Sequence, residues 1–186
     1  MNQFSIIETP IDGLKIIERK PIDDSRGFLA RIFCGDYLKS AGWEKPIAQI
    51  NQTVSKKMGA VRGLHFQNTP HAEMKLVSCL QGEIWDVAVD LRKNSATFLH
   101  WHAEKLSAEN CRALLIPEGF AHGFQTLSDD CELLYLHSAP YRPEAEAGLS
   151  PKDPKLSISW PLDFSEISRK DSNHPLIGDE FKGIAL

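Results

Sequence analysis

The sequence predicts an all-β protein, a sandwich or barrel built from many short strands. Short segments rich in β-branched and aromatic residues, several with apolar and polar residues alternating, recur along the chain. Turn-forming residues separate these segments at regular intervals. Helical patterns are confined to residues 36–41 and 165–171. Many strands with few helices are typical of a sandwich or barrel.

Length and composition indicate one globular domain. The chain has 186 residues, of which 42% are hydrophobic and 25% are charged, a length that suits one core and is short for two. We expect a single domain over residues 1–186, with a loose C-terminal tail after about residue 172. The formal net charge of -4 disfavours nucleic acids and membrane surfaces as partners, since both attract basic proteins.

The N-terminus and the cysteines indicate a cytoplasmic protein. Residues 1–10 lack the basic start and apolar centre of a signal peptide, and apolar runs such as residues 112–117 are too short to span a bilayer. The cysteines contain no CxxC pair, so we expect reduced, packed thiols and no zinc cluster. They are Cys34, Cys79, Cys111 and Cys131.

The N-terminal segment is predicted to contain strands at residues 14–18 and 28–33, separated by a turn at residues 21–27. Within the turn, Arg26 precedes Gly27, so a guanidinium and a flexible backbone could face an anion together. A solvated turn arginine is the alternative interpretation.

A short helix over residues 36–41 is expected to end at Gly42, because glycine readily adopts the left-handed conformation that closes a helix. The strand expected over residues 46–54 places the amides of Gln49 and Asn51 on one face. Such amides suit hydroxyl or phosphate groups, although a wet sheet surface is the alternative.

The segment over residues 61–67 carries a cation and an imidazole on one short strand. Strict alternation would point Arg62, Leu64 and Phe66 to one side and His65 to the other. Such a strand suits the wall of a pocket, although an ordinary barrel strand with a packed histidine is the alternative.

Residues 75–80 and 83–90 are predicted to pair as a hairpin across Gln81 and Gly82, with Asp86 at an edge or in a pocket. Along the strand at 131–137, Tyr135 and His137 share one face. A loop over residues 141–154 follows that strand. Further strands are expected at residues 97–102, 112–116 and 156–160.

Four motifs follow one another in order. They are Arg-Gly-Leu-His-Phe-Gln at 62–67, Lys-Leu-Val at 75–77, Asp-Val-Ala-Val-Asp-Leu-Arg at 86–92 and Ile-Pro-Glu-Gly-Phe-Ala-His-Gly-Phe at 116–124. With them the chain resembles, from about Gly27 to Asp171, the dTDP-4-dehydrorhamnose 3,5-epimerases, cupin-type jelly rolls with short peripheral helices. The resemblance implies a homodimer, a nucleotide-linked 4-keto-6-deoxyhexose as substrate, no cofactor and no metal.

Epimerisation beside a ketone needs a base on one face of the sugar, an acid on the other and a cation near the enolate oxygen. The resemblance implies that His65 is the base and Asp171 the carboxylate paired with it. It assigns the acid to Tyr135 and the cation to Lys75. The implied reaction inverts C3, C5 or both in a 4-keto-6-deoxyhexose, and inversion of both converts dTDP-4-dehydro-6-deoxyglucose to dTDP-4-dehydrorhamnose.

The resemblance also implies substrate-binding residues. Arg26 and Arg62 would contact the pyrophosphate, which planar guanidinium groups fit well. His122 would lie near the sugar and Tyr141 would stack on the base. The full set is Arg26, Gln49, Asn51, Arg62, His122, Tyr141, Glu146 and Lys170.

The chain departs from the family pattern mainly at nucleotide contacts. Arg31 stands where many members have an acid, Ile50 separates Gln49 from Asn51 where many have aspartate, and the segment 136–140 lacks an aromatic residue found in some relatives. These departures leave the nucleotide (thymidine, guanosine or cytidine) and the exact sugar open.

Two other functions stay open at this stage. Pro117, Gly119 and His122 fit a cupin motif of metal-dependent oxygenases or isomerases. The His-x-His that should accompany it is His65-Phe66-Gln67, which lacks one histidine ligand. A catalytically silent sugar-nucleotide binder is the other alternative.

Overall fold

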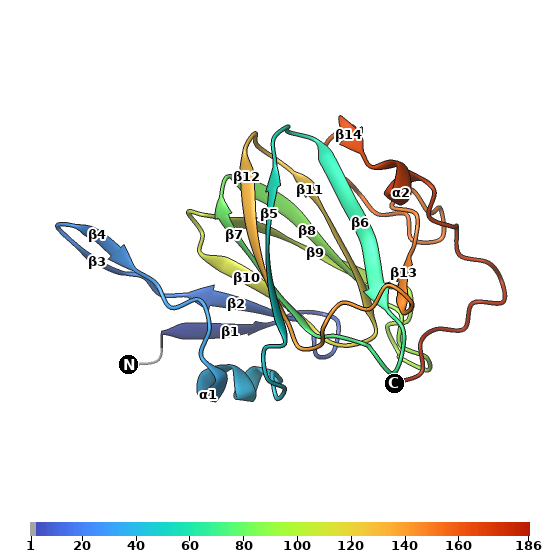
Figure 1. The fold of residues 1–186 in the computed structure, drawn as a ribbon, viewed down its shortest axis with the longest axis horizontal. Coiled ribbons are helices and arrows are strands. Elements are labelled where there is room, and N and C mark those ends of the chain that lie inside the picture. Colours follow the sequence, from blue (N-terminus) through green and yellow to red (C-terminus); the bar gives the residue numbers. More distant parts are fainter. Residues whose placement is uncertain (1–2) are drawn as a thin grey trace.

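The computed structural model describes residues 3–186 as two facing β-sheets with short peripheral elements (Figure 1). The first sheet has the order β1 (Phe4–Glu8), β2 (Lys15–Arg19), β10 (Arg112–Ile116), β7 (Lys75–Gln81), β12 (Cys131–His137), β5 (Gln49–Ser55). The second has the order β13 (Glu146–Gly148), β6 (Ala60–Gln67), β11 (Phe120–Thr126), β8 (Glu83–Asp90), β9 (Trp101–Ser107), and β14 (Glu166–Ile167) pairs with β6. The predicted all-β class is confirmed.

The peripheral elements are short. The hairpin of β3 (Ile22–Asp24) and β4 (Gly27–Leu29) projects from the body, at the left of Figure 1. It replaces the longer strand predicted over residues 28–33. The expected helix consists of α1 (Gly35–Leu38) and a 3-10 turn, η1 (Lys39–Ala41), which ends at Gly42 with φ 104° as predicted. A second helix, α2, covers Arg169–Ser172. Within the described residues, no helix has the length and apolarity needed to cross a membrane.

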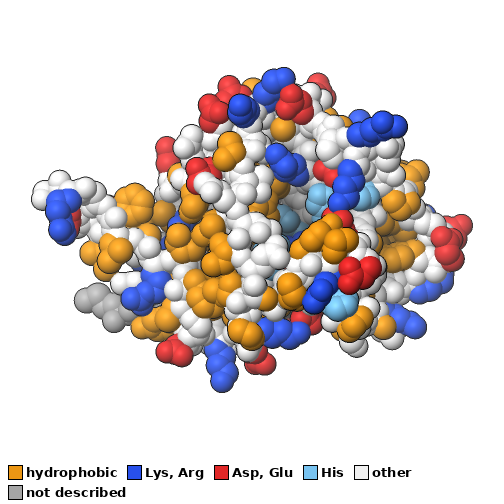
Figure 2. Space-filling model, in the orientation of Figure 1, with side chains coloured by type: hydrophobic (Ala, Val, Ile, Leu, Met, Phe, Trp, Pro, Cys, Tyr) orange, Lys and Arg blue, Asp and Glu red, His pale blue; other side chains and the backbone are white. Residues whose placement is uncertain are grey.

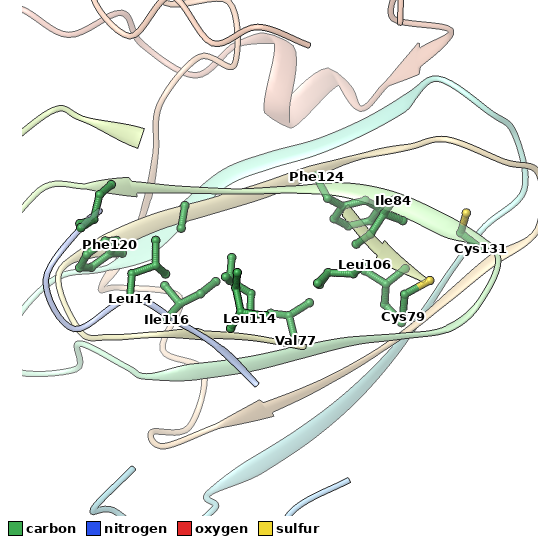
Figure 3. Close-up of a cluster of buried hydrophobic side chains, with 14 residues drawn as sticks. Leu14, Val77, Cys79, Ile84, Leu106, Leu114, Ile116, Phe120, Phe124 and Cys131 are labelled. Carbon is green, nitrogen blue, oxygen red and sulfur yellow. The ribbon is translucent and has the colours of Figure 1, made fainter. Parts of the chain in front are cut away.

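Apolar side chains fill the space between the two sheets (Figure 3). Val77 and Leu114 come from the first sheet, and Ile84 and Phe124 from the second. Each outer face is covered as well. One cluster, around Leu38 and Trp43, joins the first sheet to the helical segment, and another, around Leu149, joins the second sheet to the C-terminal segment. Coverage on both faces explains why several strands are apolar throughout.

The predicted hairpin of residues 75–80 and 83–90 is wrong. Both strands exist, but β7 lies in the first sheet and β8 in the second. The chain crosses from one sheet to the other at Gly82, which has φ 74°. A glycine turn between two apolar strands fits either connection, so the local signal did not distinguish a hairpin from a crossing.

Three further expectations need correction. Residues 156–160 form no strand; the side chains of Leu156 and Trp160 pack on the outer face of the second sheet instead. The strand expected at 97–102 begins only at Trp101. The segment after residue 172 is not loose along its whole length, since Ile177 and Ile184 are buried at 6% exposure and Ile184 forms an isolated β-bridge with Arg92, just after β8.

Candidate active site

A cavity of about 1070 Å³ opens between the sheets, close to the upper limit of the sizes usual for small-molecule sites. Figure 2 shows histidines inside this hollow, with lysine and arginine side chains at its rim. Its walls come from β5, β6, β7, β11, β12 and the segment 165–171. The polar lining includes Asn51, Arg62, His65, Lys75, His122, Tyr135, His137 and Asp171.

A bulge in β6 places Arg62 and His65 on the same wall. His65 pairs with His122 and Arg62 with Phe124, so β6 carries one more residue between these pairs than β11 does. The prediction that Arg62 and His65 face opposite sides is therefore wrong. Gly63, with φ 118°, permits the bulge, because a Cβ there would lie 2.6 Å from Cα of Gly123.

His65 and Asp171 form a hydrogen-bonded pair, with 2.7 Å between Nε2 and Oδ1. The other Asp171 oxygen accepts from the backbone N–H of Gly63 at 3.2 Å, and Ser168 caps α2 by accepting from the Asp171 N–H at 3.0 Å. Burial alone would raise the pKa of Asp171, but the hydrogen bond and charge of His65 outweigh it and lower the pKa. An ionised carboxylate thus fixes the imidazole, whose side chain is 34% exposed to the cavity.

Tyr135 lies on the opposing sheet, beside a second imidazole–carboxylate pair. His122 Nε2 lies 2.7 Å from Oδ1 of the fully buried Asp86. The rings of His122 and Tyr135 meet edge to face at 5.9 Å. Burial raises the pKa of Tyr135 well above its ordinary value, Asp86 raises it further, and the Arg62 charge opposes both. Tyr135 therefore keeps its proton at neutral pH and can donate it.

Lys75 is held in the cavity wall by Glu73. The Lys75 ammonium lies 3.2 Å from one Glu73 oxygen, and His137 Nδ1 lies 2.9 Å from the other. The His137 ring stacks on Tyr135 at 6.0 Å and 18°. Burial alone would raise the pKa of Glu73, but the hydrogen bond of His137 and the charge of Lys75 lower it. The ionised carboxylate of Glu73 therefore lies between the Lys75 ammonium and the His137 imidazole.

A network of polar side chains adjoins the cavity. The Tyr141 hydroxyl donates to Glu146 at 2.7 Å and the Lys170 ammonium donates to the same carboxylate at 2.6 Å. The Tyr141 N–H donates to the side chain of Gln49, which in turn donates to Asn51 in the cavity wall. Tyr141 itself is 48% exposed, so its ring is accessible for stacking.

Comparisons with known proteins point to one family. The family model for dTDP-4-dehydrorhamnose 3,5-epimerase matches residues 8–179. The chain is 44% identical to the dTDP-4-dehydrorhamnose 3,5-epimerase of Methanothermobacter thermautotrophicus, over 93% of this chain and 94% of that protein. The chain belongs to this family. It is also 36% identical to the dTDP-4-dehydrorhamnose 3-epimerase of Streptomyces niveus, over 91% of this chain and 82% of that protein.

A solved structure of the family has the same fold. The crystal structure of dTDP-6-deoxy-D-glucose-3,5-epimerase from Legionella pneumophila, in complex with dTDP-4-keto-L-rhamnose, superposes with a TM-score of 0.89. It is 43% identical and covers 93% of this chain and 92% of that one. The resemblance of the sequence motifs to the epimerase family, and the jelly-roll fold that it implied, are confirmed.

The structure groups most of the residues that the family motifs pointed to. His65, Asp171, Lys75 and Tyr135, assigned to proton transfer, line the cavity with Asn51, Arg62 and His122. Gln49, Tyr141, Glu146 and Lys170 form the adjoining network. Arg26 is not among the residues lining the cavity. Its side chain is 87% exposed on the β3–β4 hairpin, where it pairs with Asp24.

Sequence reasoning missed two polar residues of the site. The sequence patterns assign no role to Glu73, and they place His137 on the face of Tyr135 without giving it a role. Each stands two positions from an assigned residue, Glu73 from Lys75 and His137 from Tyr135. On a strand that spacing selects one face, which was the available signal for His137.

Proposed function

We propose that the chain is an epimerase acting on a dTDP-linked 4-keto-6-deoxyhexose. It would invert C3, C5 or both, and inversion of both carbons would convert dTDP-4-dehydro-6-deoxyglucose to dTDP-4-dehydrorhamnose. The observation that carries the proposal is the arrangement of one cavity: His65 held by Asp171 on one sheet, and the protonated Tyr135 on the other. A base and an acid on opposing walls are what inversion beside a ketone needs.

The residues suggest one sequence of proton transfers. His65 removes the proton from the carbon next to the ketone, and Asp171 stabilises the imidazolium that forms. Because Nε2 of His65 is hydrogen-bonded to Asp171, Nδ1 is the nitrogen assigned to the substrate. The electron pair moves to the ketone oxygen, where Lys75 stabilises the enolate. Tyr135 returns a proton from the opposite face, and solvent resets both groups.

The other assigned side chains would bind the nucleotide. Arg62 lines the cavity and is oriented by the Ser55 hydroxyl at 3.0 Å, so its guanidinium is positioned for a pyrophosphate. Tyr141 would stack on the base, with Glu146 and Lys170 beside it. The names of the relatives, which act on dTDP-linked sugars, favour thymidine as the nucleoside. One relative is named as a 3-epimerase, an enzyme that inverts C3 alone. The number of carbons inverted is therefore part of what the experiment below must decide.

We propose a homodimer in which the partner supplies Arg26. The projecting hairpin exposes apolar side chains, Ile22 at 54%, Phe28 at 67% and Leu29 at 71%. A cluster of this kind on a protruding element favours an interface. In a two-fold dimer each hairpin would pack on the other copy and bring Arg26 to that copy's cavity. This arrangement explains why Arg26, which matches a substrate-binding position of the family, lies away from the cavity of its own chain.

The alternatives have less support. A metal-dependent oxygenase would need His-x-His where the chain has His65-Phe66-Gln67. A silent binder would have no need for a buried lysine and a hydrogen-bonded imidazole–carboxylate pair in one cavity. We also propose a cytoplasmic location, because the cysteines are unpaired and reduced thiols persist in that compartment.

Deuterium wash-in tests the proposal. The protein is incubated in D₂O with 4-keto-6-deoxyglucose linked to thymidine, guanosine or cytidine diphosphate, and label is located by NMR. An epimerase places deuterium at C3, C5 or both and inverts those carbons, with the thymidine substrate fastest. His65→Ala should place none. Absence of exchange with every nucleotide would leave a binder, and exchange at the native rate in His65→Ala would show that another group is the base.

A further inference from the structure

A third side chain, His174, meets the pair formed by His65 and Asp171. Its Nε2 lies 3.7 Å from Asp171 Oδ1, the oxygen that also contacts His65. The two imidazole rings meet edge to face with 5.4 Å between centroids. One ligand atom from each of the three residues lies within 4.8 Å of the others. Two imidazoles and one carboxylate are a donor set that binds divalent transition metals.

His174 is fixed in this position by the fold. Its backbone N–H donates to the Asp171 carbonyl at 3.3 Å, one turn earlier. Its ring packs against Gly148, where a Cβ would lie only 2.3 Å from the ring. Gly148 is also the β13 residue that pairs with His65 on β6. The glycine therefore leaves room for a ring beside the proposed base.

The Nε2 atom of His174 is buried and has no hydrogen-bond partner within the described chain. The side chain is 11% exposed, and the separation of 3.7 Å from Asp171 is too long for a hydrogen bond. A buried orphan nitrogen calls for an occupant, either water or an ion. Because a carboxylate oxygen of Asp171 lies 3.7 Å from this nitrogen and also contacts a second imidazole, one cation placed among them would be a partner for all three groups.

We propose that His65, Asp171 and His174 form a binding site for a divalent transition metal, with Zn²⁺ as the best fit, that inhibits the enzyme. Ligand distances near 2.0–2.2 Å require only that His65 and Asp171 separate slightly and the rings close in. Glu146 and Lys170 nearby neutralise each other through their ion pair, leaving Asp171 as the local charge. The metal replaces the proton shared by His65 and Asp171.

A metal ion bound at this site would prevent His65 from acting as the general base. Asp171 would bind the cation and no longer stabilise the imidazolium, and the bound cation would withdraw electron density from His65. Binding stands on the structure alone, whereas the effect on turnover rests on the proposed function. The two are measured separately.

Metal binding is tested without substrate by titrating the metal-free protein with Co²⁺, whose visible absorption reports ligation, and with Zn²⁺ by calorimetry. We expect one ion per chain in the native protein. His174→Ala should weaken binding by more than about tenfold, the loss found even for outer-shell partners of a metal. If His174→Ala does not fold, His174→Gln replaces it, keeping a polar side chain against Gly148.

His102→Ala is the matched control, since His102 Nε2 is also buried without a partner and lies 3.9 Å from Glu104. Within the described chain His102 belongs to no such three-residue group, so this variant should bind metal as the native protein does. Equal affinity of His174→Ala and native protein, or no saturable binding by the native protein, overturns the proposal.

Inhibition is tested by deuterium wash-in with and without Zn²⁺. Zinc should stop exchange by the native protein, a chelator should restore it, and His174→Ala should need more than about tenfold more zinc. Zinc that binds the native protein without slowing exchange overturns the inhibitory part. If the metal-free protein exchanges no deuterium, the proposed function fails, and the cobalt titration still decides the site.

Discussion

The imidazole of His137 lies 2.9 Å from the Glu73 carboxylate, measured from Nδ1 to Oε2. Lys75 lies 3.2 Å from the other oxygen of Glu73, and these side chains are only 9% to 11% exposed. Water therefore has little access to replace either contact. Glu73 links the proposed enolate-stabilising cation to the imidazole that stacks on the proposed acid, Tyr135.

Removing Glu73 should slow the reaction more than it weakens substrate binding. Glu73→Ala leaves a buried ammonium without its counter-charge, so Lys75 is expected to move toward solvent. We predict a fall in kcat of about tenfold or more, with a smaller change in KM, because the enolate exists only during the reaction. Steady-state kinetics with the dTDP-linked substrate measure both parameters.

A double-mutant cycle with His137→Leu checks that the two residues act together. We expect a coupling of about 0.5–3 kcal/mol in kcat/KM, the range for residues that share one network. Glu132→Ala is the control, because Glu132 is on the same strand as Tyr135 but bonds to Gln52 outside the cavity. Strict additivity of Glu73→Ala and His137→Leu would show that the link has no role.

Tyr135→Phe should separate proton removal from inversion. His65 and Asp171 remain intact in this variant, so deuterium should still enter at the carbon beside the ketone. Inversion should fall by roughly 10²–10⁴-fold, the usual contribution of a general acid. NMR of the product in D₂O reports label and configuration together. Inverted product at the native rate would show that another group donates the proton.

The strand pattern predicted the all-β class and most of the site, but not the geometry between Arg62 and His65. Alternation assigned these residues to opposite faces, and the bulge in β6 placed them together. A bulge depends on the register with β11, and a single strand's sequence carries no register. Gly63 was the local sign of an irregular strand.

The pairing of strands that are far apart in the sequence likewise could not be predicted from local sequence patterns. Gly82 predicted a turn correctly, yet whether β7 and β8 pair or separate depends on which strands lie between them in space. The burial of Ile177 and Ile184 depends on the outer face of the second sheet being apolar. The pairing of His122 with Asp86 needs adjacent strands, β11 and β8, that are far apart in sequence. The family motifs supplied residue roles that composition alone did not.

Mixing two inactive variants tests whether Arg26 acts in the partner's cavity. Alone, Arg26→Ala and His65→Asn should each be nearly inactive, since one lacks a pyrophosphate contact and the other lacks the base. In a mixed dimer, the Arg26→Ala chain retains His65 and receives the intact Arg26 of the other chain, so one site is complete. After random exchange of equal amounts, activity should return to about a quarter of native, the statistical share for a two-fold dimer.

The control for this experiment is the mixture of His65→Asn with Asp171→Asn. Both residues belong to the same cavity of one chain, so no mixed dimer gains a complete site. Sedimentation measurements confirm that exchange has occurred. Recovery in the control, or none in the test mixture of exchanged dimers, would argue against the shared site.

Acid stability should depend on Asp90, at the end of β8. Its fully buried carboxylate accepts from Arg92 at 2.8 Å, Ser95 at 2.6 Å and Thr97 at 2.7 Å. Burial alone would raise the pKa of Asp90, but these hydrogen bonds lower the pKa from 3.8 to about 2. Because the pKa is lower in the folded state, the ionised carboxylate stabilises the fold above pH 3.8, and this contribution disappears as the pH falls to about 2.

The lowered pKa corresponds to about 2 kcal/mol of unfolding free energy at neutral pH. Asp90→Asn should therefore unfold more easily than the native protein at pH 7, and the difference should shrink on acidification through this range. Urea unfolding at a series of pH values measures this difference in unfolding free energy between the variant and the native protein. The control is Asp163→Asn, at an exposed position whose carboxylate makes no hydrogen bond or ion pair within the described chain, so its pH dependence should match the native protein. Parallel plots of unfolding free energy against pH for Asp90→Asn and native protein would show that Asp90 does not cause the loss of stability in acid. A group that titrates differently in the folded and unfolded states must change the slope of such a plot.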